Sequence, residues 1–166
     1  MTISMDSITE AVVRRTILFL RDEVQIKTKN HNIQYMEEKR MELTYLTSII
    51  TVGSTPPVYI MFSYEQQLIE KIFEAYTEGL DIHPEEKYEY IEETAGDILN
   101  IVVGNITPEL QQDEKNEKTI ISLSTPIVFS KADSIAKSKT LKFSVSCLRT
   151  VHGNMTIFCV GPNELF

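Results

Sequence analysis

Apolar residues recur at the spacing of an α-helix in three segments of the chain. The first begins near Ser7, which forms a capping box with Glu10 three residues later. Gly79 follows the second segment as a stop signal, and Pro84 opens the third at a first-turn position, where proline is tolerated. Pro108 is expected to end the third helix. The pattern therefore predicts helices over residues 7–24, 64–76 and 84–105.

Shorter apolar runs bounded by turn residues predict strands. The runs 41–52 and 58–62 should pair as a hairpin, because a glycine and two prolines separate them. His152, Gly153 and Asn154 should form the turn of a second hairpin near the end of the chain. Together with an irregular early strand, the predicted set lies at residues 33–36, 41–52, 58–62, 119–124 with a continuation past Pro126, 141–148 and 155–160.

The run 141–148 alternates between apolar and polar side chains. Phe143 and Val145 lie on the apolar side of this pattern, whereas Ser144 and Ser146 lie on the polar side. Because successive side chains of a strand point to opposite faces, we expect one buried face and one wetter face that holds the serines.

The order of the elements is roughly α-β-β-α-α-β-β-β, and one more early strand is left open. This order favours an α+β fold in which helices pack on an antiparallel sheet. Neither an internal repeat nor a proline- or serine-rich linker divides the chain, so residues 1–166 are expected to form a single domain.

Composition and charge narrow the function classes. The 166 residues are 42% hydrophobic and 24% charged, which is ordinary for a globular protein. A net charge of −8 is a poor match for nucleic acid or anionic lipid, so we expect neither as a partner. Two arginines break the apolar stretch at residues 11–20, which argues against a signal peptide, and a glycine with two prolines interrupts the uncharged run 43–64. We therefore expect a cytoplasmic protein without a membrane span.

The predicted helix at residues 84–105 carries the informative polar pattern, since the Walker A, dinucleotide-binding, HExxH and GxSxG motifs are all absent. At roughly 100° per residue, Glu93, Asp97, Asn100 and Gly104 fall on one face, nearly opposite an apolar stripe. Asn100 and Gly104 are poor helix formers, so something other than helix stability favours them. Two interpretations are open at this point: a functional site, or an ordinary solvated face on a helix whose glycines allow close packing.

The segment GDILNIVVGN in this helix resembles the motif of the CheX/CheC family of chemotaxis response-regulator phosphatases, which carries G-E-x-x-N, an apolar triplet and G-N. The run ELTYLTSIITVGSTPPVYIMFSYEQQLIEKIFEAY resembles the hairpin and following helix of that family. LSTPIVFSKADSI resembles the segment after the motif helix, with Pro126 in the place of the family's proline. The chain carries one such motif helix, which resembles the CheX branch, whereas CheC proteins usually carry the motif twice.

The resemblance implies an activity and a partner. Members of the family dephosphorylate a CheY-like response regulator, with the motif helix docked at the phospho-aspartate. On this resemblance, Asn100 orients a water for in-line attack on phosphorus, and Asp97, in the place of the family's glutamate, pairs with a lysine of the partner. The same motif implies partner contacts for Glu93, Gly96 and Gly104. It implies no cofactor on this chain, since the Mg²⁺ ion belongs to the response regulator.

The resemblance also implies an oligomeric state, because CheX proteins form homodimers in which the two sheets join. The C-terminal hairpin has alternating apolar residues and few charges apart from Arg149. Edge strands that lack charges are prone to pair with another chain. We therefore expect a homodimer that associates through sheet elements.

The chain departs from the family motif at Asp97. Aspartate is one methylene shorter than glutamate, a loss of reach of roughly 1.5 Å, and a misplacement of that order can slow catalysis about 100-fold. The alternative function is therefore a non-catalytic CheX-like domain that binds a receiver or another signalling partner. A general α+β domain with an accidental motif is a third interpretation.

Overall fold

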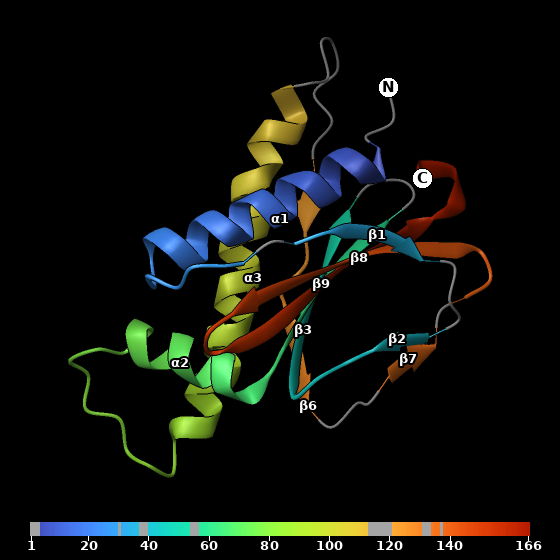
Figure 1. Cartoon of the computed structure of the whole chain (residues 1–166). Helices are drawn as coiled ribbons and strands as arrows, with labels where there is room; N and C mark the ends of the chain where they lie inside the picture. Colours follow the sequence, from blue (N-terminus) through green and yellow to red (C-terminus); the bar gives the residue numbers. More distant parts are fainter. Residues whose placement is uncertain are drawn as a thin grey trace.

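An antiparallel sheet of seven strands occupies the centre of the molecule (Figure 1). Its order is β1-β8-β9-β4-β3-β5, and β6 also pairs with β3. The computed structural model describes residues 4–29, 31–36, 40–53, 57–112, 121–130, 134–136 and 138–166. The strands of this sheet are β1 (Ile33–Met36), β3 (Leu46–Gly53), β4 (Val58–Tyr64), β5 (Ser122–Leu123), β6 (Ile127–Ser130), β8 (Leu141–Thr150) and β9 (Gly153–Pro162).

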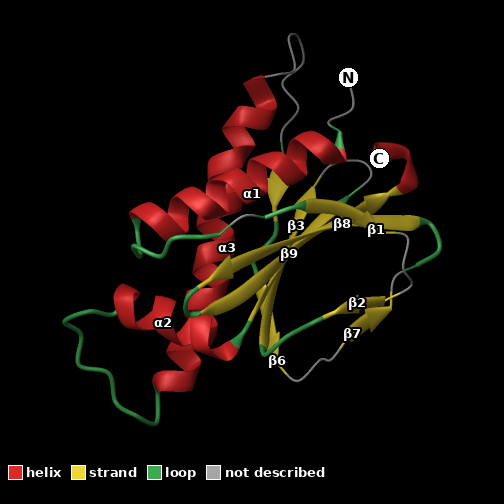
Figure 2. Cartoon of the chain, in the orientation of Figure 1, coloured by secondary structure: helices red, strands yellow, loops and turns green. Residues whose placement is uncertain are grey.

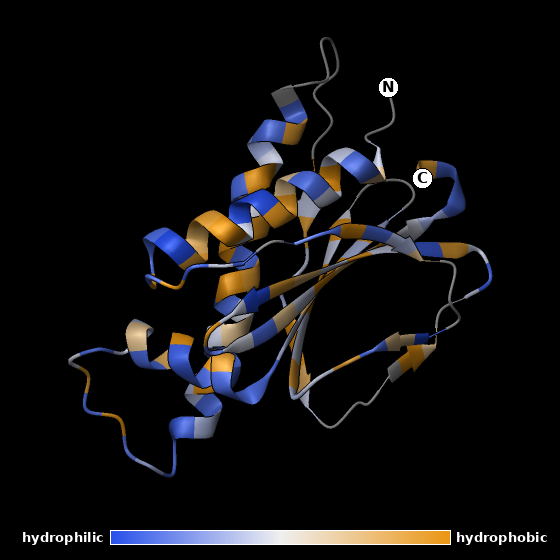
Figure 3. Ribbon diagram, viewed as in Figure 1, coloured by the Kyte–Doolittle hydropathy of each residue, from blue (hydrophilic) through white to orange (hydrophobic). Residues whose placement is uncertain are grey.

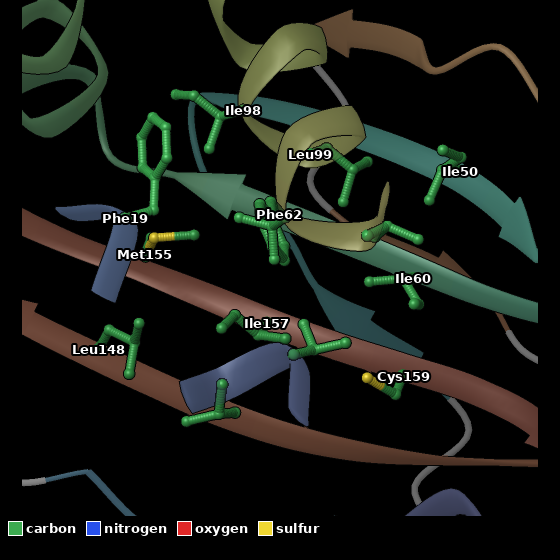
Figure 4. Packing of buried hydrophobic residues seen from close by; sticks show 14 of the residues in the cluster. Phe19, Ile50, Ile60, Phe62, Ile98, Leu99, Leu148, Met155, Ile157 and Cys159 are labelled. Carbon is green, nitrogen blue, oxygen red and sulfur yellow. The ribbon is translucent and has the colours of Figure 1, made fainter. Parts of the chain in front are cut away.

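Three helices cover one face of this sheet (Figure 2). They are α1 (Met5–Asp22), α2 (Gln66–Tyr76) and α3 (Lys87–Gln112), and a short 3-10 helix, η1 (Asn163–Leu165), follows β9. Figure 3 shows both hydrophobic and hydrophilic positions around each of the long helices. The hydrophobic side chains join those of the sheet in one large core, part of which is drawn in Figure 4.

The opposite face of the sheet carries a second, smaller cluster of buried apolar residues. A separate two-stranded ribbon, β2 (Arg40–Glu42) with β7 (Ser134–Ala136), supplies Met41 and Ile135 to it. Phe143 and Phe158 of the sheet lie in the same cluster, with their ring centroids 5.9 Å apart. The sheet is therefore covered on both sides.

Because protein covers both faces of the sheet, the prediction that the serines of 141–148 lie on a wetter face is wrong. Ser144 and Ser146 point toward the helices and are 0% and 1% exposed. The Ser144 hydroxyl hydrogen-bonds to that of Thr9 in α1 at 2.8 Å. An alternating strand reveals which side chains share a face, but not whether protein or water lies over the polar one.

The helices exist as predicted, but their starts differ, and α1 ends at Asp22, two residues earlier than predicted. Ser4, not Ser7, caps α1, and its hydroxyl accepts a hydrogen bond from the Ser7 amide at 3.2 Å. The helix α2 begins at Gln66 because β4 continues to Tyr64. The helix α3 begins at Lys87, after a turn that includes Pro84.

The prediction that Pro108 ends α3 is wrong, because the helix continues to Gln112. Proline removes one helical N–H, yet tertiary contacts hold the turn that follows it. Leu110 is buried, and Glu109 pairs with both Arg14 and Arg15 of α1.

The strand predictions are confirmed for the early strand at Ile33–Met36 and for the β3–β4 hairpin, with two changes. The predicted run 41–52 is divided, since β2 leaves the main sheet to pair with β7. In the C-terminal hairpin Thr150 pairs with Gly153, so the turn consists of Val151 and His152. The predicted start at residues 119–120 lies outside the described residues.

Gly96 lies where α3 packs against β6 and the residue before it. A Cβ atom at this position would lie 3.4 Å from Cγ2 of Val128 and 3.7 Å from Cβ of Pro126. These are ordinary van der Waals distances, so an added methyl group fits but leaves no space for a longer side chain.

We expect Gly96→Ala to unfold at the same or a higher urea concentration than wild type, because alanine is the better helix former. Gly96→Leu should lower the free energy of unfolding by about 1–3 kcal/mol, since its additional atoms would overpack the contact with Val128 and Pro126. Urea denaturation followed by circular dichroism measures both. Equal stability of the leucine variant and the wild type would contradict the close contact.

Candidate functional site

The exposed face of α3 holds the polar residues that the sequence pattern brought together. The apolar stripe predicted for this helix is buried, as expected, and Ile98 and Leu99 point into the core in Figure 4. Asp97 and Asn100 are both exposed. The exposed residues between positions 93 and 108 of α3 are Glu93, Asp97, Asn100, Ile101, Gly104, Asn105 and Pro108.

Asp97 and Asn100 are neighbours on this face and are free to act together. Residues three apart on a helix have Cβ atoms about 5–6 Å apart. Within the described part of the chain, neither side chain takes part in a hydrogen bond or an ion pair. A partner docked on α3 therefore meets a carboxylate and an amide that do not first have to give up another contact.

Gly104 opens the surface one turn beyond Asn100. No atom lies within 4 Å of the position that its Cβ would occupy, so neither the fold nor close packing requires a glycine there. Pro108, four residues later, has no N–H to donate to the Gly104 carbonyl. This turn of α3 therefore presents bare backbone, which another protein can approach closely.

Gly96 does not lie on this face, and the expected partner contact at Gly96 is therefore corrected. Its backbone is buried against Pro126 and Val128 at the junction with β6. The residue keeps α3 close to the sheet, whereas Glu93, one turn before Asp97, is exposed as expected.

Tyr76 of α2 and Glu23, the C-cap of α1, lie beside Ile101 and Asn105 of α3, and the sequence pattern singled out neither of them. Tyr76 ends α2, and its ring centroid lies 6.0 Å from that of Phe19 in α1. Burial raises the pKa of Tyr76, and the nearby carboxylates of Asp97 and Glu23 raise it further. Because these residues are far apart along the chain, no local motif could have revealed this arrangement.

A pocket of about 370 Å³ opens beside the exposed face, between α1, the end of α2 and α3. Ile101 and Asn105 belong both to that face and to the pocket wall. The lining residues are Arg15, Leu18, Phe19, Asp22, Glu23, Tyr76, Ile101, Val102 and Asn105.

The described residues contain neither a metal-binding cluster nor a membrane-spanning helix. No group of three or more His, Cys, Asp or Glu side chains among them could hold a metal ion. None of the described helices combines the length and the apolar character needed to cross a membrane.

Solved structures of chemotaxis proteins share this arrangement of sheet and helices. CheX from Desulfovibrio desulfuricans matches with a TM-score of 0.75 at 15% identity, over 92% of this chain and 97% of that one. A CheC-like superfamily protein from Shewanella sp. PV-4 matches with a TM-score of 0.74 at 19% identity, over 96% and 99% of the two chains. The protein described here has the CheX/CheC-like fold.

A third match comes from the crystal structure of the CheX–CheY–BeF3–Mg²⁺ complex of Borrelia burgdorferi. Its TM-score is 0.64 at 13% identity, and the match covers 91% of this chain and 95% of that chain. No protein-family model and no curated protein sequence matches this chain. The α+β architecture and the CheX/CheC-like fold expected from the sequence are confirmed by these structures.

Proposed function

We propose that this protein is a phosphatase that accelerates hydrolysis of the aspartyl phosphate on a CheY-like response regulator. The observation that carries the proposal is the exposed pair of Asp97 and Asn100 on α3, neither of which forms a hydrogen bond or an ion pair among the described residues. The CheX/CheC-like fold adds support, because the CheX chain from Borrelia burgdorferi was crystallised with CheY. Such an activity belongs in bacterial chemotaxis or other two-component signalling, in the cytoplasm.

Asn100 supplies the catalytic group in this proposal. Hydrolysis of an acyl phosphate forms a bond between a water oxygen and phosphorus, breaks the bond from phosphorus to the aspartyl oxygen, and releases phosphate. The loose transition state of phosphoryl transfer requires positioning more than a covalent catalyst. The Asn100 amide oxygen accepts a hydrogen bond from the water and holds its oxygen in line with the breaking bond.

Asp97 has a docking role. Its carboxylate pairs with a lysine beside the phosphoryl group of the receiver, and this charge-assisted hydrogen bond sets the register of Asn100. Glu93 and Gly104 contribute further contacts from the same face, and Gly104 allows a close approach. The Mg²⁺ ion arrives with the receiver, so this chain needs no cofactor of its own.

The alternative is a CheX-like domain that binds a receiver or another signalling partner without hydrolysing the phosphate. The observation that favours it is the aspartate at position 97, whose reach is roughly 1.5 Å shorter than that of a glutamate. The two functions differ in one measurable respect. Only a phosphatase makes the receiver release its phosphate faster than it does alone.

A homodimer that associates through sheet elements is part of the proposal. In the C-terminal hairpin, β9 pairs with β4, and β8 pairs with β1 over residues 143–146. Among the described strands, the edges of the main sheet are β1 and the β5–β6 side, so the two sheets would join at one of these.

Replacing Asn100 tests the catalytic role. We expect Asn100→Ala to reduce stimulated dephosphorylation roughly 100-fold or more, by analogy with other positioned polar groups. Stability should hold or rise, because Asn100 is exposed and alanine is the better helix former. Asn163→Ala is the matched control, since it removes an exposed amide from η1. Phosphate release by Asn100→Ala at the wild-type rate would contradict the assignment.

Changes at Asp97 test the docking role. Asp97→Ala should weaken receiver binding about tenfold, as expected for loss of a charged hydrogen bond. Asp97→Glu should raise the dephosphorylation rate by restoring the missing reach, whereas a lower rate would mean that the receiver surface is adapted to aspartate. The control is Glu89→Ala, which removes an exposed acid from the first turn of α3. If neither Asp97 variant alters binding or rate, this face of α3 is not the site.

Light scattering tests the proposed homodimer. The polypeptide has a mass of 19.0 kDa, so a homodimer should give twice that mass at micromolar concentration. A monomer mass under the same conditions would contradict the proposed homodimer. It would not affect the proposed site on α3.

A further inference from the structure

The pocket beside α3 is lined partly by apolar side chains. Phe19 and Val102 are 6% and 1% exposed, and together with Leu18 they provide apolar walls. Tyr76 and Ile101 are each 38% exposed at its margin. An aliphatic stem would bury apolar area against these walls, and an aromatic face such as that of Tyr76 also attracts a cation.

The charges of the pocket are unevenly distributed along α1. Arg15 lies toward one end, where its guanidinium pairs with Glu109. Asp22 and Glu23 lie about two helical turns away, at the C-terminal end of α1. Asp22 is paired with Arg21 at 2.6 Å, whereas no ion pair is formed by Glu23 within the described residues. The end of the pocket near Glu23 is therefore negative.

The end of α1 strengthens this negative charge. Glu23 is the C-cap of α1, and the carbonyl groups at a helix C-terminus carry a partial negative charge. A cationic group placed here would meet the Glu23 carboxylate and a helix C-terminus.

We propose that this pocket takes a lysine or arginine side chain of the receiver, as a second anchor beside the Asp97–Asn100 face. The stem of that side chain packs between Phe19, Tyr76 and Ile101, and its charged end reaches Glu23. The inference rests on the proposed function, because it assumes that a receiver docks on α3.

The position of the pocket explains why the same partner reaches both places. Ile101 lies four residues after Asp97, about one helical turn, and Asn105 lies one turn further along the same face. Both residues also line the pocket. A protein that covers Asp97 and Asn100 and extends along α3 to Asn105 therefore also passes over the pocket, and a basic side chain there would add selectivity among receivers.

The test measures binding of the cognate CheY-type receiver, loaded with beryllium trifluoride and Mg²⁺, to the full-length protein at low and high salt. Glu23→Gln should weaken binding about tenfold and reduce its salt dependence, because one charge of the pair is lost. Glu23→Lys should weaken it further, and a lysine or arginine to glutamate change on the receiver should restore binding to Glu23→Lys. A lysine at a helix C-terminus is compatible with folding, which circular dichroism will confirm.

The matched control is Glu10→Gln, which removes the same charge from an exposed position of α1 roughly 20 Å from Glu23. It should bind the receiver like the wild type. If the wild type binds the receiver and both Glu23 variants bind equally well, the pocket inference fails and the phosphatase proposal stands. If the wild type binds no activated receiver, the proposed function itself fails and the pocket inference with it.

Discussion

The burial of one side of α3 against the sheet is the constraint on which the rest of the structure depends. Ile98 and Leu99 of this helix are 0% exposed, and they face Ile50, Ile60 and Phe62 of the sheet (Figure 4). A helix that buries such a stripe cannot rotate about its axis without exposing it. The same contact that stabilises the core therefore fixes which residues of α3 face outward.

This constraint lets α3 carry residues that are unfavourable for a helix. Asn100 and Gly104 cost helix propensity and lie on the exposed side of the helix, and Pro108 removes one hydrogen bond. The buried stripe and the pairing of Glu109 with α1 compensate for these losses. A site on a rigid helix held in this way is more precise than one on a loop, which suits a reaction that depends on positioning.

The sequence predicted the features that depend on local periodicity and missed those that depend on contacts between distant segments. The outward direction of Asp97 and Asn100 follows from the 3.6-residue repeat of the stripe behind them. The burial of Ser144 could not be predicted, because it depends on α1 lying over that face of the sheet. The approach of Glu23 and Tyr76 to the site likewise requires three helices to be brought together. Hydrophobic periodicity identifies the face of one element, and tertiary packing decides what lies opposite it.

The central claim is that the exposed face of α3 turns over phosphorylated receiver rather than only binding it. The most direct measurement is phosphate release from a phosphorylated CheY-like receiver that is present in large molar excess over this protein. The account predicts that each molecule of the protein releases many phosphates, at a rate well above that of the receiver alone. Saturable binding without any acceleration of phosphate release would contradict the claim and identify the protein as a binding domain.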